Sequence, residues 1–218
     1  MKKVALITGA SRGIGLASAR KFASEGYDVI CSYSKTPIEE FKSIRANLVS
    51  ETDIINLFSS IPKLDVLVNC AGIHGQKSKL EDLSFNQIDE VFKNNTYSVF
   101  LCCREAVKLM KESGGTIVNI SSEAAKFGGV NMSAYAASKA AINTLTVALA
   151  REVAEYKIRV NAVSPGIIDT GIHDTAKAST IPLGRMGTTQ EVADTIFYLA
   201  SDSASYVSGA ILSVAGAR

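Results

Sequence analysis

The chain has 218 residues, 47% of them hydrophobic, which is enough for one domain with a buried core. Its 23 basic and 21 acidic residues leave a net charge of +2 and are scattered, which argues against a nucleic-acid or membrane-surface partner. Four cysteines without CxxC spacing, two histidines and no secretory or membrane-spanning segment predict a cytoplasmic protein with free thiols and no metal site.

Short apolar runs alternate with longer helical patterns along the chain, which is typical of a parallel sheet covered by helices on both faces. The predicted strands are Val4–Ile7, Val29–Tyr33, Ile44–Leu48, Val66–Asn69, Thr116–Ile120, Arg159–Val163 and Ile211–Val214. The predicted helices are Gly13–Glu25, Glu51–Ser59, Phe85–Lys93, Tyr97–Glu112, Ser133–Tyr156 and Thr189–Ser201. Right-handed crossovers then give a single Rossmann-type, doubly wound α/β domain over residues 1–218, with strand order 3-2-1-4-5-6-7. Ligands of such sheets bind beyond the carboxyl ends of the strands.

The first strand leads directly into a glycine-rich turn and then a helix. The turn is Thr8-Gly9-Ala10-Ser11-Arg12-Gly13-Ile14-Gly15. Glycines let the backbone approach a pyrophosphate, whose charge the helix N-terminus stabilises. Glycines also end strands for purely structural reasons, but the strand–turn–helix context favours a dinucleotide site.

Further motifs follow in order: Asn69-Cys70-Ala71-Gly72, then Asn95, Ser122, Tyr135-x-x-x-Lys139 and Pro165-Gly166-x-x-x-Thr170. Together with the glycine-rich turn they resemble the short-chain dehydrogenase/reductase family over nearly the whole chain, with Cys70 in place of the family's second Asn. The resemblance implies an oxidoreductase that moves a hydride between a nicotinamide dinucleotide and a carbonyl or hydroxyl carbon. The cofactor contacts that it implies are Gly9, Ser11, Arg12, Gly13, Ile14, Gly15, Ser34, Asn47, Leu48, Asn69, Cys70, Ala71, Gly72, Tyr135, Lys139, Pro165, Gly166, Ile168 and Thr170.

The end of the second strand bears on the choice between NAD and NADP. An acid there binds the ribose 2′-hydroxyl, whereas basic and hydroxyl groups accept a 2′-phosphate. This strand ends at Tyr33, Ser34 and Lys35 without an aspartate, and Arg12 adds a basic group in the turn. We therefore predict NADP(H), with NAD(H) as the alternative if Arg12 and Lys35 are only solvated surface charges.

The proton chemistry is predicted to lie on Tyr135 and Lys139, which are four residues apart and share one helix face. An ammonium beside the phenol should lower its pKa from about 10 and so suit it to acid–base work. Ser122 would orient the substrate oxygen, and Asn95, by resemblance, would anchor a water relay. Each residue alone could also serve the fold only, through packing, a surface charge or a cap.

The substrate is less determined by the sequence. Gly171–Ile181 corresponds to the family's substrate lid and is short, which suits small substrates or tethered acyl groups. The chain is most similar to bacterial 3-oxoacyl-carrier-protein reductases of fatty-acid biosynthesis, but it has Ser113 and Tyr156 where those enzymes commonly place docking arginines beside the active-site mouth. An NAD-linked alcohol or sugar dehydrogenase and a non-catalytic dinucleotide sensor are the alternatives. The family further implies a homotetramer or homodimer.

Overall fold

A seven-stranded parallel sheet forms the centre of the molecule. The computed structural model describes residues 2–171 and 179–217. The sheet order is β3-β2-β1-β4-β5-β6-β9, as predicted. The strands that follow β1 in the chain are added first on one side of it and then on the other. Leu6 of β1 accordingly lies between Ile30 of β2 and Leu67 of β4. The strands are β1 (Val4–Ile7), β2 (Asp28–Tyr33), β3 (Lys42–Arg45), β4 (Val66–Asn69), β5 (Gly115–Ile120), β6 (Ile158–Pro165) and β9 (Ile211–Val214).

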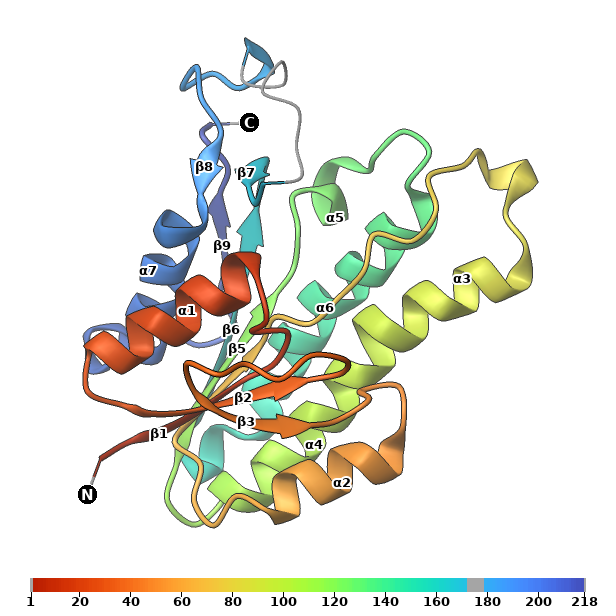
Figure 1. Ribbon diagram of the computed structural model, residues 1–218. Coiled ribbons are helices and arrows are strands. Elements are labelled where there is room, and N and C mark those ends of the chain that lie inside the picture. Colours follow the sequence, from red (N-terminus) through yellow and green to blue (C-terminus); the bar gives the residue numbers. More distant parts are fainter. Residues whose placement is uncertain (1, 172–178, 218) are drawn as a thin grey trace.

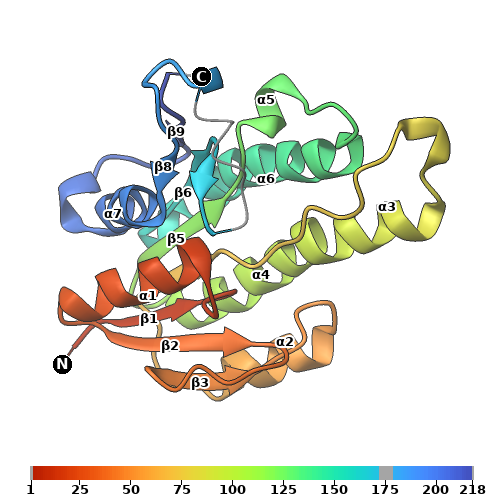
Figure 2. The ribbon, with the colours of Figure 1, turned by 45° about the horizontal axis from the view of Figure 1, so that its top comes forward.

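Helices cover both faces of the sheet (Figures 1 and 2). One face carries α1 (Gly13–Ser24) and α7 (Thr189–Ala200), and the other carries α2 (Glu51–Ser59), α4 (Ser98–Met110) and α6 (Ser133–Glu152). Each layer has its own apolar core, since Phe22 of α1 packs in one cluster and Ile142 of α6 in the other. Among the helices that the structure describes, none combines the length and hydrophobicity needed to span a bilayer.

The chain departs from the predicted elements at several joints. The predicted helices Phe85–Lys93 and Tyr97–Glu112 are one continuous helical segment, because α3 (Phe85–Phe92) continues through the π-helical turn η2 (Lys93–Tyr97) into α4. β3 ends at Arg45 rather than Leu48, and the predicted helix to Tyr156 ends at Glu152 before a separate turn, η3 (Ala154–Tyr156). Elements that the sequence pattern did not predict are all short: η1 (Leu80–Asp82), α5 (Ala124–Phe127), β7 (Ile168–Asp169), β8 (Gly187–Thr188) and η5 (Asp202–Ala204).

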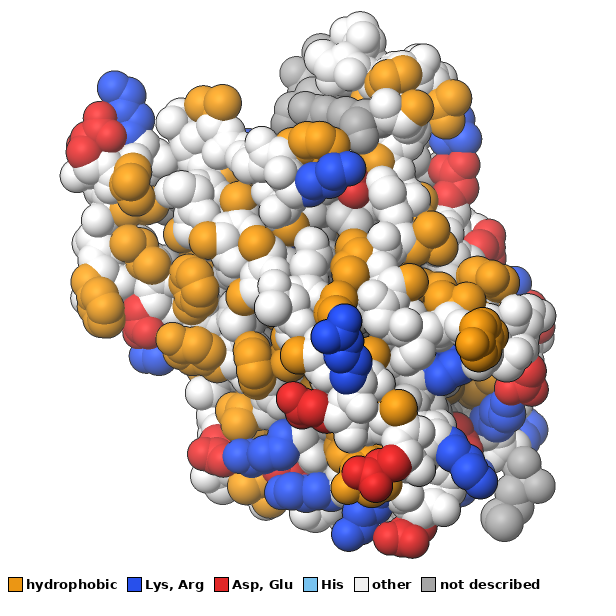
Figure 3. Space-filling view, turned by 180° about the vertical axis from the view of Figure 1, so that it is seen from behind, with side chains coloured by type: hydrophobic (Ala, Val, Ile, Leu, Met, Phe, Trp, Pro, Cys, Tyr) orange, Lys and Arg blue, Asp and Glu red, His pale blue; other side chains and the backbone are white. Residues whose placement is uncertain are grey.

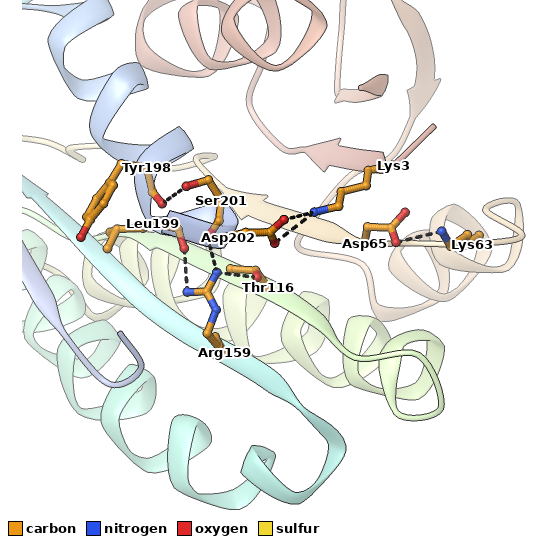
Figure 4. A network of polar contacts seen from close by, with 9 residues as sticks. All are labelled: Lys3, Lys63, Asp65, Thr116, Arg159, Tyr198, Leu199, Ser201 and Asp202. Carbon is orange, nitrogen blue, oxygen red and sulfur yellow. Dashed lines mark hydrogen bonds and ion pairs between the residues drawn. The ribbon is translucent and has the colours of Figure 1, made fainter. Parts of the chain in front are cut away.

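Arg159 of β6 ties the carboxyl end of α7 to the sheet (Figure 4). Its guanidinium donates to the carbonyl oxygens of Leu199 at 2.8 Å, Ser201 at 3.0 Å and Val207 at 3.1 Å, and to Thr116 Oγ1 at 3.2 Å. A cation suits this place because the last carbonyls of a helix lack intrahelical partners and carry partial negative charge. Arg159 therefore supports the fold at the amino end of β6, away from the strand ends where ligands bind.

Candidate active site

The turn between β1 and α1 packs closely against the loop that follows β4. Gly9 has φ +65°, and a Cβ there would lie 2.7 Å from the Cα of Ala71. A Cβ on Gly15 would collide with the carbonyl oxygen of Gly9. Thr8 Oγ1 accepts hydrogen bonds from the backbone N–H groups of Cys70 at 3.0 Å and Ala71 at 3.1 Å. The ends of the first and fourth strands are thus joined by hydrogen bonds, and the backbones approach closely where Gly9 and Gly15 have no side chain.

The N-terminus of α1 lies beside this contact and is suited to hold a pyrophosphate. Arg12 is the N-cap residue with an exposed side chain, and it makes no side-chain hydrogen bond to the helix. The first-turn N–H groups therefore remain for an anion, which the positive end of the helix dipole also favours. A Cβ on Gly13 would meet Thr170 Cγ2 at 3.6 Å, so Thr170 covers the turn from the far side. The free donors at this helix N-terminus fit the pyrophosphate of a dinucleotide.

The residues expected to contact the adenosine half of the cofactor follow the carboxyl ends of β2 and β3. Ser34 and Lys35 follow β2 and are exposed, and Tyr33 is partly buried. Asn47 is exposed, and its backbone N–H donates to Asp53 Oδ2 at 3.0 Å, while Leu48 is half-buried. Because parallel strands end at the same edge of the sheet, these side chains share an edge with the α1 turn.

Ser122 and Tyr135 meet at the end of β5. Tyr135, on the first turn of α6, is 9% exposed, and its side chain hydrogen-bonds with Ser122. Burial raises the pKa of Tyr135 above its ordinary value, and the Ser122 hydrogen bond opposes that rise. The predicted lowering of this pKa by Lys139 is therefore wrong for this structure: desolvation outweighs the other influences on the phenol, so Tyr135 is protonated at neutral pH.

Lys139 lies one turn further along α6 with its ammonium in the interior. It is 4% exposed, and Nζ donates to the carbonyl oxygen of Ile120 at 2.7 Å. Burial lowers the pKa of Lys139 to about 8, while Cys70 acts weakly in the opposite direction. A Cβ on Gly72 would lie 3.5 Å from Nζ, which places the ammonium directly beneath the loop after β4. Lys139 is thus positioned beside the dinucleotide surface and not on the exterior.

Asn95 is fully buried in the π-helical turn and fixes the loop after β4. Its Oδ1 accepts from the Ile73 N–H, and its Nδ2 donates to the Ile73 carbonyl oxygen, both at 2.8 Å. Nδ2 also donates to Ser138 Oγ at 3.1 Å, and Ser138 Oγ donates to the Tyr135 carbonyl oxygen at 2.7 Å. A π turn shifts helix register by one residue, which lets Asn95 face α6. These hydrogen bonds thus link Asn95 to α6, the helix that carries Tyr135 and Lys139.

Some predicted cofactor residues lie away from the open surface. Asn69 is 2% exposed, and its amide donates to Asn119 Oδ1 at 2.9 Å and to Cys103 Sγ at 3.3 Å, so its side chain belongs to a polar network beneath the site. Ile168 is 4% exposed and packs in the core, although β7 places its backbone after Pro165-Gly166. Most of the predicted lid, residues 172–178, lies outside the described residues.

The positions compared with carrier-protein docking arginines do not flank the active site of this chain. Ser113 precedes β5 and Tyr156 precedes β6, at the amino ends of strands whose carboxyl ends carry the site. Parallel strands of six and eight residues separate the two edges by roughly 20 Å or more. The expectation that these positions lie beside the mouth is therefore wrong within a single chain.

One residue that contacts the site, His74, was not predicted from the sequence. His74 lies in the loop after β4, and its ring centroid is 4.7 Å from that of Tyr135 in an edge-to-face arrangement at 69°. Its position two residues after Ala71-Gly72 was the only local signal, because the contact with α6 arises from tertiary packing.

The geometry agrees with comparisons to known proteins. The family model described as Enoyl-(Acyl carrier protein) reductase matches residues 9–216. The chain belongs to the short-chain dehydrogenase/reductase family. It is therefore an NAD(P)-dependent oxidoreductase, and the family resemblance of the sequence motifs is confirmed.

Relatives of this short-chain dehydrogenase/reductase span its whole length. The uncharacterized oxidoreductase YgfF of Escherichia coli (strain K12) is 40% identical, with 99% of each chain covered. The 3-oxoacyl-[acyl-carrier-protein] reductase FabG of Aquifex aeolicus (strain VF5) is 38% identical, covering 98% of this chain and 96% of the relative. A 3alpha-hydroxysteroid dehydrogenase of Mediterraneibacter gnavus is 36% identical, covering 99% and 96%. These similar identities support the reaction class without selecting a substrate.

Proposed function

We propose that this short-chain dehydrogenase/reductase is an NADPH-dependent ketone reductase acting on 3-oxoacyl thioesters or similar small ketones. The observation that carries the proposal is the Ser122–Tyr135 pair beside the buried Lys139, next to the uncapped N-terminus of α1. The bound cofactor supplies the hydride. Ser122 and Tyr135 hold the ketone oxygen, and the protonated phenol delivers the proton to the developing alkoxide. Lys139 would hold the cofactor ribose, and Asn95 would anchor the relay that restores the phenol proton.

A screen of NADPH consumption tests this function. Acetoacetyl thioesters, diketones, quinones and sugars are offered with NADPH, and a hydroxysteroid and simple alcohols are offered with NAD in the reverse direction. We expect the fastest oxidation of NADPH with the acetoacetyl thioesters. Turnover confined to alcohols, sugars or the steroid with NAD would contradict the proposal, and cofactor binding without turnover of any substrate would indicate a dinucleotide sensor.

Cofactor preference is proposed to depend on Arg12, which is exposed at the α1 turn on the same sheet edge as Ser34. Arg12→Ala should raise the Kd for NADPH by about 10- to 100-fold, since a charge-assisted hydrogen bond contributes about 1.5–3 kcal/mol. The Kd for NADH should stay nearly constant, because NADH lacks the 2′-phosphate. Arg151→Ala, which removes an exposed guanidinium at the far end of α6, is the matched control. Tighter binding of NADH than of NADPH by the unaltered protein would overturn this assignment.

We infer a homotetramer built through two surfaces. Figure 3 shows hydrophobic side chains gathered on the side of the molecule that carries α3, α4 and α6, where Tyr97 and Phe100 are about half exposed. The second surface is the free edge of β9, where Ile211 and Leu212 are exposed, together with Tyr198 of α7. An unpaired strand edge and exposed aromatics favour self-association. Sedimentation should give a tetramer at micromolar concentration; monomer alone would contradict this.

A cytoplasmic location is part of the same proposal. The cysteines Cys31, Cys70, Cys102 and Cys103 are free thiols, and burial raises the pKa of Cys31, Cys70 and Cys103 to about 12. Unpaired cysteines are typical of reducing compartments.

A further inference from the structure

The segment that follows β6 connects the two parts of the active site. At its start, the carbonyl oxygen of Pro165 accepts a hydrogen bond at 3.0 Å from the N–H of Glu123, the residue after Ser122. At its end, Thr170 lies over the α1 turn, where a Cβ on Gly13 would meet its Cγ2 at 3.6 Å. In the proposed reaction the ketone oxygen is held at Ser122, so a dinucleotide with its pyrophosphate at α1 must extend its nicotinamide toward Ser122. The nicotinamide half is therefore expected to run along this segment.

A two-stranded ribbon holds the middle of this segment. β7 pairs with β8 beyond the carboxyl ends of the sheet strands (Figures 1 and 2). The Gly187 N–H of β8 donates to the carbonyl oxygen of Ile167 at 3.0 Å. A ribbon of two strands is marginally stable without further support, and these strands have only two residues each. A cavity of about 450 Å³ lies against the ribbon, with Ile167 and Gly187 in its wall, so packing on that side is incomplete.

The carboxylate of Glu191, at the start of α7, supplies support to β8. Its Oε2 accepts from the Thr188 N–H at 2.7 Å and from Thr188 Oγ1 at 3.2 Å. Arg185 donates to both carboxylate oxygens, with Nη1 2.9 Å from Oε2 and Nη2 2.5 Å from Oε1, and its Nη1 also donates to the Met186 carbonyl oxygen at 3.1 Å. These bonds join both neighbours of Gly187 into one network. The Arg185 hydrogen bond is the largest of the influences that lower the pKa of Glu191 to about 2, so the carboxylate is charged at neutral pH.

We propose that Arg185 and Glu191 are positioning residues for the cofactor. Their ion pair fixes β8, and through β8 and β7 it holds the backbone along which the nicotinamide half binds, without touching cofactor or substrate. The two side chains are 57% and 41% exposed, so the pair should contribute little to global stability, and Arg185→Met should lower Tm by no more than about 4 °C. The inference rests on the proposed placement of the nicotinamide beside Ser122 and requires no particular substrate.

The test compares the binding of NADPH with that of adenosine 2′,5′-bisphosphate, which lacks the nicotinamide half. Arg185→Met removes the ion pair but leaves the hydrogen bonds between Glu191 and Thr188. It should raise the Kd for NADPH by about 3- to 10-fold, the equivalent of about one hydrogen bond, and leave the Kd for the bisphosphate unchanged. Glu191→Gln, which can still cap α7, should give the same selective loss. The double variant should lose no more than either single variant, because both changes remove one interaction.

Arg20→Met is the matched control, because Arg20 binds both carboxylate oxygens of Glu40 in a similarly exposed pair, at 59% and 47%. It should leave the ratio of the two Kd values unchanged. Equal rises in both Kd values in Arg185→Met would show that the pair supports the whole fold, and no rise in either would show that β7 is held without it; each overturns the inference, as do losses that add in the double variant. If Arg185→Met does not fold, Glu191→Gln decides by the same criteria.

These measurements need no turnover. Failure of the proposed ketone reduction and failure of this inference are therefore observed separately. If the wild type binds NADH more tightly than NADPH, NADH and AMP replace the two ligands, and the same selective loss is expected.

Discussion

Tyr135→Phe should lower kcat for the proposed ketone reduction by a factor of 10² to 10⁴, the usual contribution of an acid–base group. The change removes one oxygen from a side chain that is 9% exposed and leaves the ring packed against His74. Because burial keeps the phenol pKa raised, the wild-type hydroxyl is protonated at neutral pH and can donate to an alkoxide. The Phe variant has no proton to give.

Cofactor binding separates this role from a structural one. The Kd of Tyr135→Phe for NADPH should change little, since the pyrophosphate surface lies on the β1–α1 turn. Tyr156→Phe is the matched control, because Tyr156 is exposed at the amino end of β6 and should keep full kcat. A Tyr135→Phe variant that retains more than about a tenth of wild-type kcat would refute proton transfer by this phenol.

Lys139→Met should abolish most turnover and yet stabilise the fold at pH 7. Burial lowers the pKa of Lys139 to about 8 from the ordinary 10.5, so the buried ammonium destabilises the folded protein at neutral pH. A shift of this size corresponds to roughly 3 kcal/mol, and the lost bond to the Ile120 carbonyl offsets about 1 kcal/mol. We expect a net gain in the free energy of unfolding of about 2 kcal/mol at pH 7.

The stability difference between wild type and Lys139→Met should change with pH in a definite direction. Between the folded pKa of about 8 and the unfolded value of 10.5, the unfolded chain binds the Lys139 proton and the folded chain does not. Stability of the wild type relative to Lys139→Met therefore rises with pH across this window, and the advantage of the Met variant disappears toward its upper end. The proposed ketone reduction by the wild type should also decline above about pH 8, as the ammonium beside the proposed cofactor surface loses its charge.

Thermal unfolding of both proteins from pH 7 to 10 measures the effect. Lys111→Met, which removes an exposed charge at the end of α4, is the control and should shift Tm little at any pH. A Lys139→Met variant that is less stable than wild type at pH 7, by a margin independent of pH, would show that the ammonium stabilises the fold.

The sequence was sufficient to predict the strands of the sheet and their order, because these strands are continuous apolar runs. Leu6, Leu67 and Ile117 are fully buried in such runs, and short apolar runs without polar alternation are typical of parallel strands covered on both faces. Element ends were less predictable. The continuous segment from α3 to α4 contains a π turn in which the Asn95 side chain bonds to Ile73 and Ser138, residues distant in sequence, and propensity along one helix carries no information on such contacts.

The sequence by itself determined which local motifs carry the chemistry and how they are spaced. These are a glycine-rich turn after the first strand, and a Tyr and a Lys one helical turn apart. These follow from short-range geometry, in which spacing fixes a shared face or a tight turn. Only the tertiary structure decided the pKa values of the site residues and which residues from distant segments contact them. Burial of Tyr135 and Lys139 moved both pKa values, and the β4 loop brought His74 onto the phenol. Desolvation and contacts between distant segments depend on the whole packed molecule, so no local pattern encodes them.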